Sequence, residues 1–180
     1  SKTQSALLEV MEEGSVTIDG VTRVLPKPFL VIATQNPIGS VGTQMLPESQ
    51  LDRFMIKLNM GYPDLQSEVD ILKARHSENP IDHVHQVASA EDIVRLQRQT
   101  EQIYVDDRIY NYIASLAQAT RQHPMLRLGI SPRGTLALTA AAKATALLRG
   151  RDYVTSDDVR FMLRDVFAHR LLLSTKARMQ

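Results

Sequence analysis

The chain has 180 residues, of which 43% are hydrophobic, enough to build one medium-sized domain or two small ones. Its 21 Lys and Arg and 20 Asp and Glu residues give a net charge of +1, so no overall field attracts nucleic acid or an anionic membrane. The absence of Cys excludes disulfides, thiolate zinc sites and thiol catalysis, and agrees with a cytoplasmic location. No apolar run approaches the roughly 20 residues of a membrane span.

The first 24 residues predict a helix followed by a β-hairpin. Apolar residues recur at helical spacing between Lys2 and Glu13, and Gly14 is suited to the left-handed C-cap that would end this helix. Asp19-Gly20 then separates two short β-prone runs, a pattern typical of a tight type I′ hairpin. The start of the chain has neither an initiator Met nor a signal-peptide layout, so we expect it to be the middle of a longer protein.

Two further segments predict strands of an α/β core. Residues 29–34 form a continuous apolar run of the kind that is buried on both faces of a sheet, and residues 54–60 alternate at period two. The stretch 35–50 is rich in Gly and Pro, which predicts a loop at the carboxyl edge where α/β folds bind ligands. Two strands and a hairpin do not close a core, so the N-terminal third must pack against something else or depend on the rest of the chain.

Beyond residue 64 the chain is predicted to be helical nearly throughout. Helices are expected from Leu65, from the capping-box pattern at Ser89, over 106–122, from Ser131-Pro132 to Leu148, and from Thr155 or Ser156. The predicted fold class is therefore α/β, with a partial α/β core over residues 1–62 followed by an all-α domain over residues 63–180.

Three polar residues could act on a phosphate group. Asn36 follows the first strand, where its amide could hold a water and a phosphate oxygen, although Asn36-Pro37 is also an ordinary turn. Arg53 could reach the nucleotide of a neighbouring subunit and stabilise charge on the transferring phosphoryl group; an ion pair between Asp52 and a basic neighbour is the alternative. Arg133 stands in the first turn of a helix, where a cation opposes the dipole, so either a phosphate or a carboxylate is expected nearby.

The order of four short segments carries more information than any single residue. These segments are 1–13 (SKTQSALLEVMEE), 33–37 (ATQNP), 46–54 (LPESQLDRF) and 131–133 (SPR). With them the chain resembles the MoxR family of AAA+ ATPases from its first residue to about its last. The resemblance implies that Asn36 is sensor 1, that Arg53 is an arginine finger acting in trans, and that Arg133 is sensor 2 of a helical lid. It also implies that the hairpin at Asp19-Gly20 is the pre-sensor-1 insertion of this group.

The chain departs from that family by lacking two motifs. It contains no Gly-x-x-x-x-Gly-Lys-Ser/Thr loop (Walker A) for phosphates and no strand ending in Asp-Glu (Walker B), which in relatives holds Mg²⁺ and lies just before the segment corresponding to Ser1. We therefore expect a C-terminal piece of the family's core and lid. ATP and Mg²⁺ are the implied cofactors, with their main ligands outside these residues, so the chain alone is expected to be inactive.

The resemblance further implies that the whole protein hydrolyses ATP as a homo-oligomer, most simply a hexameric ring, because a finger acting in trans needs a neighbour. Its work would be the remodelling or maturation of a client protein or of a partner in metal-cofactor maturation. Neither a nucleic-acid partner nor a metal site is expected, since the five His residues show no clear ligand set. Two alternatives are a non-enzymatic helical interaction module and the ATPase subunit of a magnesium-chelatase-like complex, which shares the same order of motifs. The wording of residues 35–37 and 47–50 favours the MoxR family.

Overall fold

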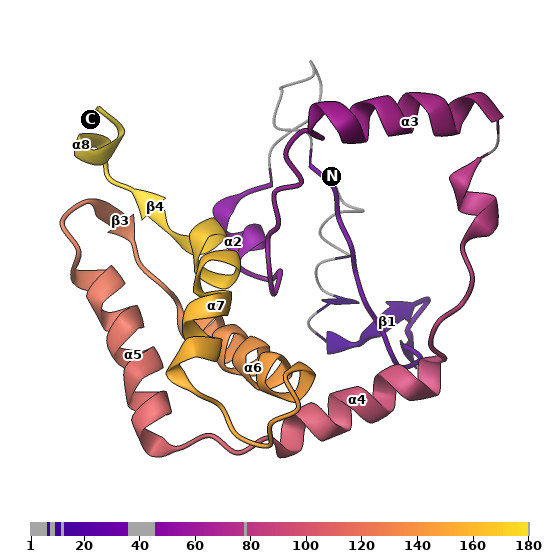
Figure 1. Ribbon diagram of the computed structural model, residues 1–180. Helices are drawn as coiled ribbons and strands as arrows, with labels where there is room; N and C mark the ends of the chain where they lie inside the picture. Colours follow the sequence, from indigo (N-terminus) through magenta and orange to yellow (C-terminus); the bar gives the residue numbers. More distant parts are fainter. Residues whose placement is uncertain (1–6, 8–9, 12, 36–45, 78, 180) are drawn as a thin grey trace.

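The computed structural model of the chain describes residues 7, 10–11, 13–35, 46–77 and 79–179. Its elements, in chain order, are β1 (Ser15–Ile18), β2 (Val21–Val24), α2 (Glu48–Leu51), α3 (Leu65–Ser77), the 3₁₀ helix η1 (Pro80–His83), α4 (Ala90–Gln102), α5 (Asp107–Gln122), β3 (Leu126–Leu128), α6 (Pro132–Leu148), α7 (Ser156–Phe167), the 3₁₀ helix η2 (Ala168–Arg170), β4 (Leu172–Leu173) and α8 (Thr175–Arg178). Helices α5, α6 and α7 gather at one side of the molecule, whereas α3 stands apart from them (Figure 1).

The hydrophobic core lies in the helical half of the chain. Helix α6 runs through the centre of this core. Its contact with α7 is the most extensive between any two of the described elements. The small side chains of Ala142 and Ala146 are fully buried on α6, which lets α7 approach closely and bury Val159 and Val166. The described core residues all fall between Ile103 and Phe167. The helical half of the chain is therefore the part that is stabilised by the packing of its own side chains.

The predicted helix starts in this half are confirmed. Ser89 and Asp92 form a capping box at the start of α4, and Ser131 accepts a hydrogen bond from the backbone of Gly134 at the start of α6. Helix α7 begins after Thr155. The region that was expected to be all-α also contains one short antiparallel pair, β3 with β4, which joins the turn after α5 to the chain after α7.

The β-hairpin and its preceding cap are also confirmed. Gly14 adopts a positive φ of 61° and donates its N–H to the carbonyl of Val10, as a left-handed C-cap does. Asp19 and Gly20 have φ values of 51° and 75°, and two positive φ angles are the mark of a type I′ turn. Strands β1 and β2 pair in antiparallel register, with Thr17 opposite Thr22.

The two predicted core strands are wrong as strands. Residues 29–35 and 56–60 belong to no helix or strand, because no strand among the described residues lies beside them to complete a ladder. Their apolar side chains consequently face solvent: Ile32 is 84% exposed and Met60 is 94% exposed. The described residues of the N-terminal third therefore bury no core of their own.

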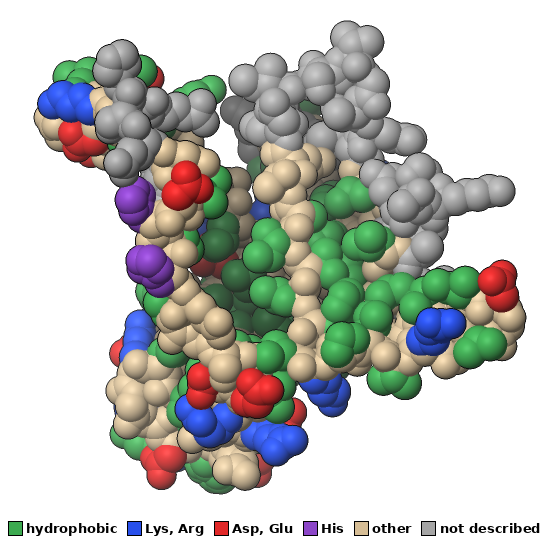
Figure 2. Space-filling view, turned by 90° about the vertical axis from the view of Figure 1, so that its right-hand side faces the viewer, with side chains coloured by type: hydrophobic (Ala, Val, Ile, Leu, Met, Phe, Trp, Pro, Cys, Tyr) green, Lys and Arg blue, Asp and Glu red, His purple; other side chains and the backbone are tan. Residues whose placement is uncertain are grey.

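The exposed surface of the whole molecule reflects this imbalance. The accessible area is 14141 Å². A compact monomer of this mass would expose about 8,800 Å². Figure 2 shows hydrophobic side chains gathered around a hollow on one face of the molecule. The exposed apolar side chains of the N-terminal third and α3 include Ile18, Val24, Leu30, Ile32, Leu58, Met60, Tyr62, Leu65 and Leu72.

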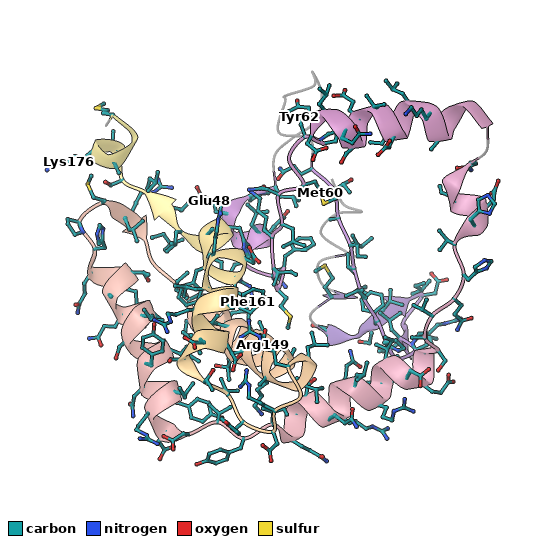
Figure 3. The ribbon with its side chains drawn as sticks, viewed as in Figure 1. Glu48, Met60, Tyr62, Arg149, Phe161 and Lys176 are labelled. Carbon is teal, nitrogen blue, oxygen red and sulfur yellow. The ribbon has the colours of Figure 1, made fainter. Side chains whose placement is uncertain are left out.

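A buried carboxylate locks the turn between α6 and α7. Asp158 is fully buried and accepts hydrogen bonds from Arg149 (2.9 Å), from Arg151 (2.6 and 2.8 Å) and from the backbone and hydroxyl of Thr155 (both 2.9 Å). Burial raises the pKa of Asp158, but the hydrogen bonds from Arg151 and Thr155 outweigh it and lower the pKa to about 2. The guanidinium of Arg149 also lies over the ring of Phe161, 4.8 Å from its centroid (Figure 3).

We expect Asp158→Asn to destabilise the chain by about 1–3 kcal/mol, because two arginines lose their shared counter-charge. Since the pKa of Asp158 is about 2 in the folded chain and 3.8 ordinarily, its contribution is complete above about pH 4 and is lost as pH falls toward 2. Thermal unfolding followed by circular dichroism should therefore show a difference between wild type and variant at pH 6 that closes near pH 2. The exposed neighbour provides a matched control, and Asp157→Asn should change stability by less than about 0.5 kcal/mol. A difference that persists unchanged at pH 2 would contradict the assignment.

Candidate functional site

Asp52 is the point at which the N-terminal third meets the helical half. It follows α2, which lies next to the end of α7 (Figure 1). Its carboxylate accepts hydrogen bonds from the hydroxyl of Ser131 (3.0 and 3.1 Å) and from Nε of Arg170 (2.9 Å). Nη1 of Arg133 lies 3.7 Å from the same carboxylate. Three groups of the helical half therefore converge on one acid of the N-terminal third.

Arg170 holds the backbone on both sides of Arg53. Its side chain is 2% exposed. Besides Asp52, its guanidinium donates to the carbonyl oxygens of Asp52 (3.2 Å), Phe54 (2.6 Å) and Met55 (3.2 Å), and also to that of Val166. A planar fork of five N–H donors can serve this many acceptors at once, which an ammonium group cannot.

His169 reinforces the same segment. Its Nε2 lies 3.0 Å from the carbonyl oxygen of Phe54. Burial lowers the pKa of His169, so the neutral imidazole is favoured and its Nε2–H donates to the carbonyl. The backbone N–H of Lys57 also donates to the carbonyl of Asp165, at 2.9 Å. Several backbone groups of the segment 52–57 thus bond to the end of α7 and to η2, and no strand among the residues described pairs with the segment.

Two glycines allow close packing around the start of α6. A Cβ atom at Gly129 would lie 2.6 Å from the backbone nitrogen of Arg121, so only glycine lets this turn lie against the end of α5. The backbone of Ile130 is fixed there on both sides: its N–H donates to Thr120 (3.0 Å) and its carbonyl accepts from Nε of Arg121 (2.8 Å). This anchored turn places Ser131 and the first turn of α6 beside Asp52.

Gly134 provides the second close approach. A Cβ atom at this position would lie 2.7 Å from Cγ2 of Ile130 and 3.0 Å from Cδ of Arg170. The side chain of Arg170 therefore passes over the first turn of α6 where a larger residue would block it. Gly134 directly follows Arg133, so the first turn of α6 brings both Arg133 and Arg170 close to Asp52.

The structure locates two of the three residues that the sequence singled out. Arg53 is half-buried in the turn after α2, and Arg133 is half-buried with its guanidinium toward Asp52. Asn36 lies outside the described residues. The carboxylate that the sequence allowed as a partner for Arg133 exists and is Asp52, and the basic neighbours expected for Asp52 are Arg133 and Arg170.

Sequence reasoning missed Arg170, His169 and Gly134. No local pattern marks them, because Arg170 pairs with a residue 118 positions earlier. Across the described part of the chain, no three His, Asp or Glu side chains form a group that could hold a metal ion. None of the described helices has the length and apolar composition needed to cross a bilayer.

Known proteins resemble the chain along its whole length. The profile of the ATPase family associated with various cellular activities (AAA) matches residues 1–56, and that of the AAA lid domain matches residues 118–180. The uncharacterized protein YeaC of Bacillus subtilis is 50% identical over 99% of this chain and 56% of its own, and chaperone MoxR1 of Mycobacterium tuberculosis is 42% identical over 98% and 49%. Magnesium-chelatase subunits are more distant, at 26% to 29% identity.

A solved structure supports the same relationship. The crystal structure of a candidate ATPase from Cytophaga hutchinsonii superimposes with a TM-score of 0.91 at 35% identity, covering 99% of this chain and 57% of that one. The chain thus spans about half the length of the relatives that it matches. Together these matches confirm the predicted fold class, the C-terminal part of an α/β core with a hairpin insertion followed by a helical lid.

We expect Gly134→Ala to destabilise the chain. An unobstructed glycine inside a helix would gain roughly 1 kcal/mol on replacement by alanine. Here the added methyl group meets Ile130, which is 1% exposed and cannot move aside. Overpacking of this kind costs about 1–3 kcal/mol, so the net loss should be about 1 kcal/mol.

Thermal unfolding measures the effect of Gly134→Ala directly. The control is Leu136→Ala on the same helix, where the side chain is 71% exposed and little packing is lost. A rise in stability for Gly134→Ala would show that the first turn of α6 is not packed tightly against Ile130 and Arg170.

Proposed function

We propose, because the chain belongs to the MoxR family of AAA+ ATPases, that it supplies the part of the enzyme that responds to ATP. In this proposal Arg53 acts on the ATP of the adjacent subunit as an arginine finger. Arg133 and Asn36 sense the γ-phosphate of the ATP bound by their own subunit. The observation that carries the proposal is that Arg133 lies 3.7 Å from the carboxylate of Asp52, the residue directly before Arg53.

The surroundings of Arg53 support a role as a finger. A cation that stabilises charge on a transferring phosphoryl group contributes most when its position is fixed before the reaction. The residue before Arg53 and the two residues after it are held through their carbonyl oxygens by Arg170. The base of the Arg53 side chain is therefore rigid although it lies in a turn.

The surroundings of Arg133 support a role as a sensor. Its guanidinium lies in the first turn of α6, where the helix dipole disfavours a cation. Asp52 offsets that cost, but the distance of 3.7 Å between the two charged groups is longer than a hydrogen bond, and the side chain of Arg133 is 41% exposed. A phosphate group carries more charge than the carboxylate and would compete for the same guanidinium.

The side chains present fit a phosphate better than a metal ion. Arg53 and Arg133 are cationic, and the described residues offer no cluster of carboxylates for Mg²⁺. Members of the family use ATP with Mg²⁺, and the 180 residues contain no Gly-x-x-x-x-Gly-Lys-Ser/Thr loop to hold them. We therefore place the main ligands of ATP and Mg²⁺ outside this chain.

The proposed assembly follows from the proposed arginine finger, and the proposed activity on a partner protein follows from the family. An arginine that acts in trans requires a neighbouring subunit, so we propose a homo-oligomeric ring, most simply a hexamer, that remodels a client protein or a partner in metal-cofactor maturation. The proposed division of the chain is a core part over residues 1–62 and a lid over residues 63–180. The higher identity to a MoxR chaperone, 42% against 26% to 29% for magnesium-chelatase subunits, favours the chaperone-like output over the chelatase alternative.

Arg53→Ala in the product of the complete gene should lower ATP turnover by about 10³-fold, because charge on the transferring group loses its stabilising cation. Binding of Mg-ATP, measured by calorimetric titration, should be retained. Arg127→Ala is a suitable control, since Arg127 is a largely exposed arginine that contacts Glu48 near the same segment. Turnover equal to wild type in Arg53→Ala would remove the finger from the proposal.

The 180-residue chain by itself should bind Mg-ATP too weakly to measure and should not hydrolyse it, because it lacks the loop that cradles the phosphates. Calorimetry on this chain, with the product of the complete gene as the positive control, tests the expectation. A micromolar Kd for the 180-residue chain would contradict it.

A further inference from the structure

Arg170 forms hydrogen bonds with the residues directly before and after Arg53 in the chain. Arg170 donates to the side chain and carbonyl of Asp52 and to the carbonyls of Phe54 and Met55. These acceptors lie immediately before and immediately after Arg53 in the chain. None of them is paired within a helix or strand among the residues described, so Arg170 supplies the partners that secondary structure would normally supply.

From this geometry we propose that Arg170 is a positioning residue for ATP hydrolysis, which fixes the direction from which Arg53 reaches the nucleotide of the neighbouring subunit. The inference rests on the proposed role of Arg53 as the finger. It adds that the lid of one subunit controls the finger offered to the next. Arg170 does not touch the nucleotide and acts only through Arg53.

The burial of Arg170 makes its position well defined. Its side chain is 2% exposed, and a buried guanidinium is tolerated only when a counter-charge and several acceptors satisfy it. Asp52 provides the charge, and the carbonyls of the finger segment provide most of the acceptors. Displacing the segment would leave Arg170 unsatisfied, so segment and guanidinium hold each other in place.

The packing of the Arg170 side chain connects the segment around Arg53 to the start of α6. Its stem lies against Gly134, and its guanidinium also bonds to the carbonyl of Val166 at the end of α7. A movement of α6 and α7 must therefore carry Arg170, and with it the segment 52–55. Arg133 lies on the same turn of α6, so the group proposed to sense a subunit's own ATP is mechanically linked to the finger that serves its neighbour.

The experiment is a double-mutant cycle in the product of the complete gene, with single-turnover ATP hydrolysis as the readout so that low rates remain measurable. Arg170→Met should slow hydrolysis by about 10- to 100-fold, the size of effect expected from a slightly misplaced catalytic group. In a background of Arg53→Ala, Arg170→Met should cause no further loss, because a residue that acts only through Arg53 has nothing left to position. The Kd for Mg-ATP should change less than about twofold in each variant.

The controls separate positioning from stability. Arg164→Met removes an exposed arginine from α7, the helix just before Arg170, and should leave hydrolysis unchanged. Arg170→Lys keeps the charge beside Asp52 but loses donors to the carbonyls, so hydrolysis should be intermediate between wild type and Arg170→Met. If Arg170→Met does not fold, Arg170→Lys carries the comparison in both backgrounds.

The outcomes distinguish this inference from the proposed function. Full activity of Arg53→Ala overturns both. A strong defect in Arg53→Ala together with wild-type activity in Arg170→Met overturns the positioning role alone. Equal losses from Arg170→Met in the wild-type and Arg53→Ala backgrounds would also overturn it, because they would show a general structural effect.

Discussion

The ion pair between Arg170 and Asp52 is the interaction on which the junction of this molecule depends. It joins residues 118 positions apart and is sheltered by the first turn of α6. Removing two charges from water is costly, and the cost is offset here because nearly every donor of the guanidinium meets an acceptor. Most of those acceptors are the carbonyls beside Arg53, so the same contacts that make the buried charge tolerable also hold the backbone around Arg53.

Asp52 serves two electrostatic purposes at once. Its negative charge lies near the start of α6, where the helix dipole favours an anion, and it offsets the unfavourable placement of Arg133 in that first turn. Its tighter partner is Arg170, at 2.9 Å against 3.7 Å for Arg133. In the proposed sensing role, Arg133 would turn to a phosphate while the pair of Asp52 and Arg170 stays intact.

Local signals in the sequence predicted what is locally determined. The caps at Ser89 and Ser131 and the turn at Asp19-Gly20 depend on residues close in the chain, and each formed as expected. The strands at 29–34 and 54–60 failed, because a strand needs a partner that its own sequence does not specify. The sequence allowed a carboxylate beside Arg133, but only the fold could identify Asp52, and it gave no sign of Arg170 because that contact spans the chain.

The two parts of the molecule are joined by polar contacts, and their core is not shared. Every residue of the described core lies between Ile103 and Phe167, whereas the contacts of the N-terminal third with the lid include the hydrogen bonds of segment 52–57 and the ion pair of Glu48 with Arg127. Apolar contacts tolerate small displacements, but hydrogen bonds weaken steeply with distance and angle. A polar junction of this kind therefore couples the orientation of the segment 52–57 to that of the lid. That property suits the proposed role of Arg53 toward a neighbouring subunit, and it gives a reason for a buried guanidinium where an apolar side chain would cost less to bury.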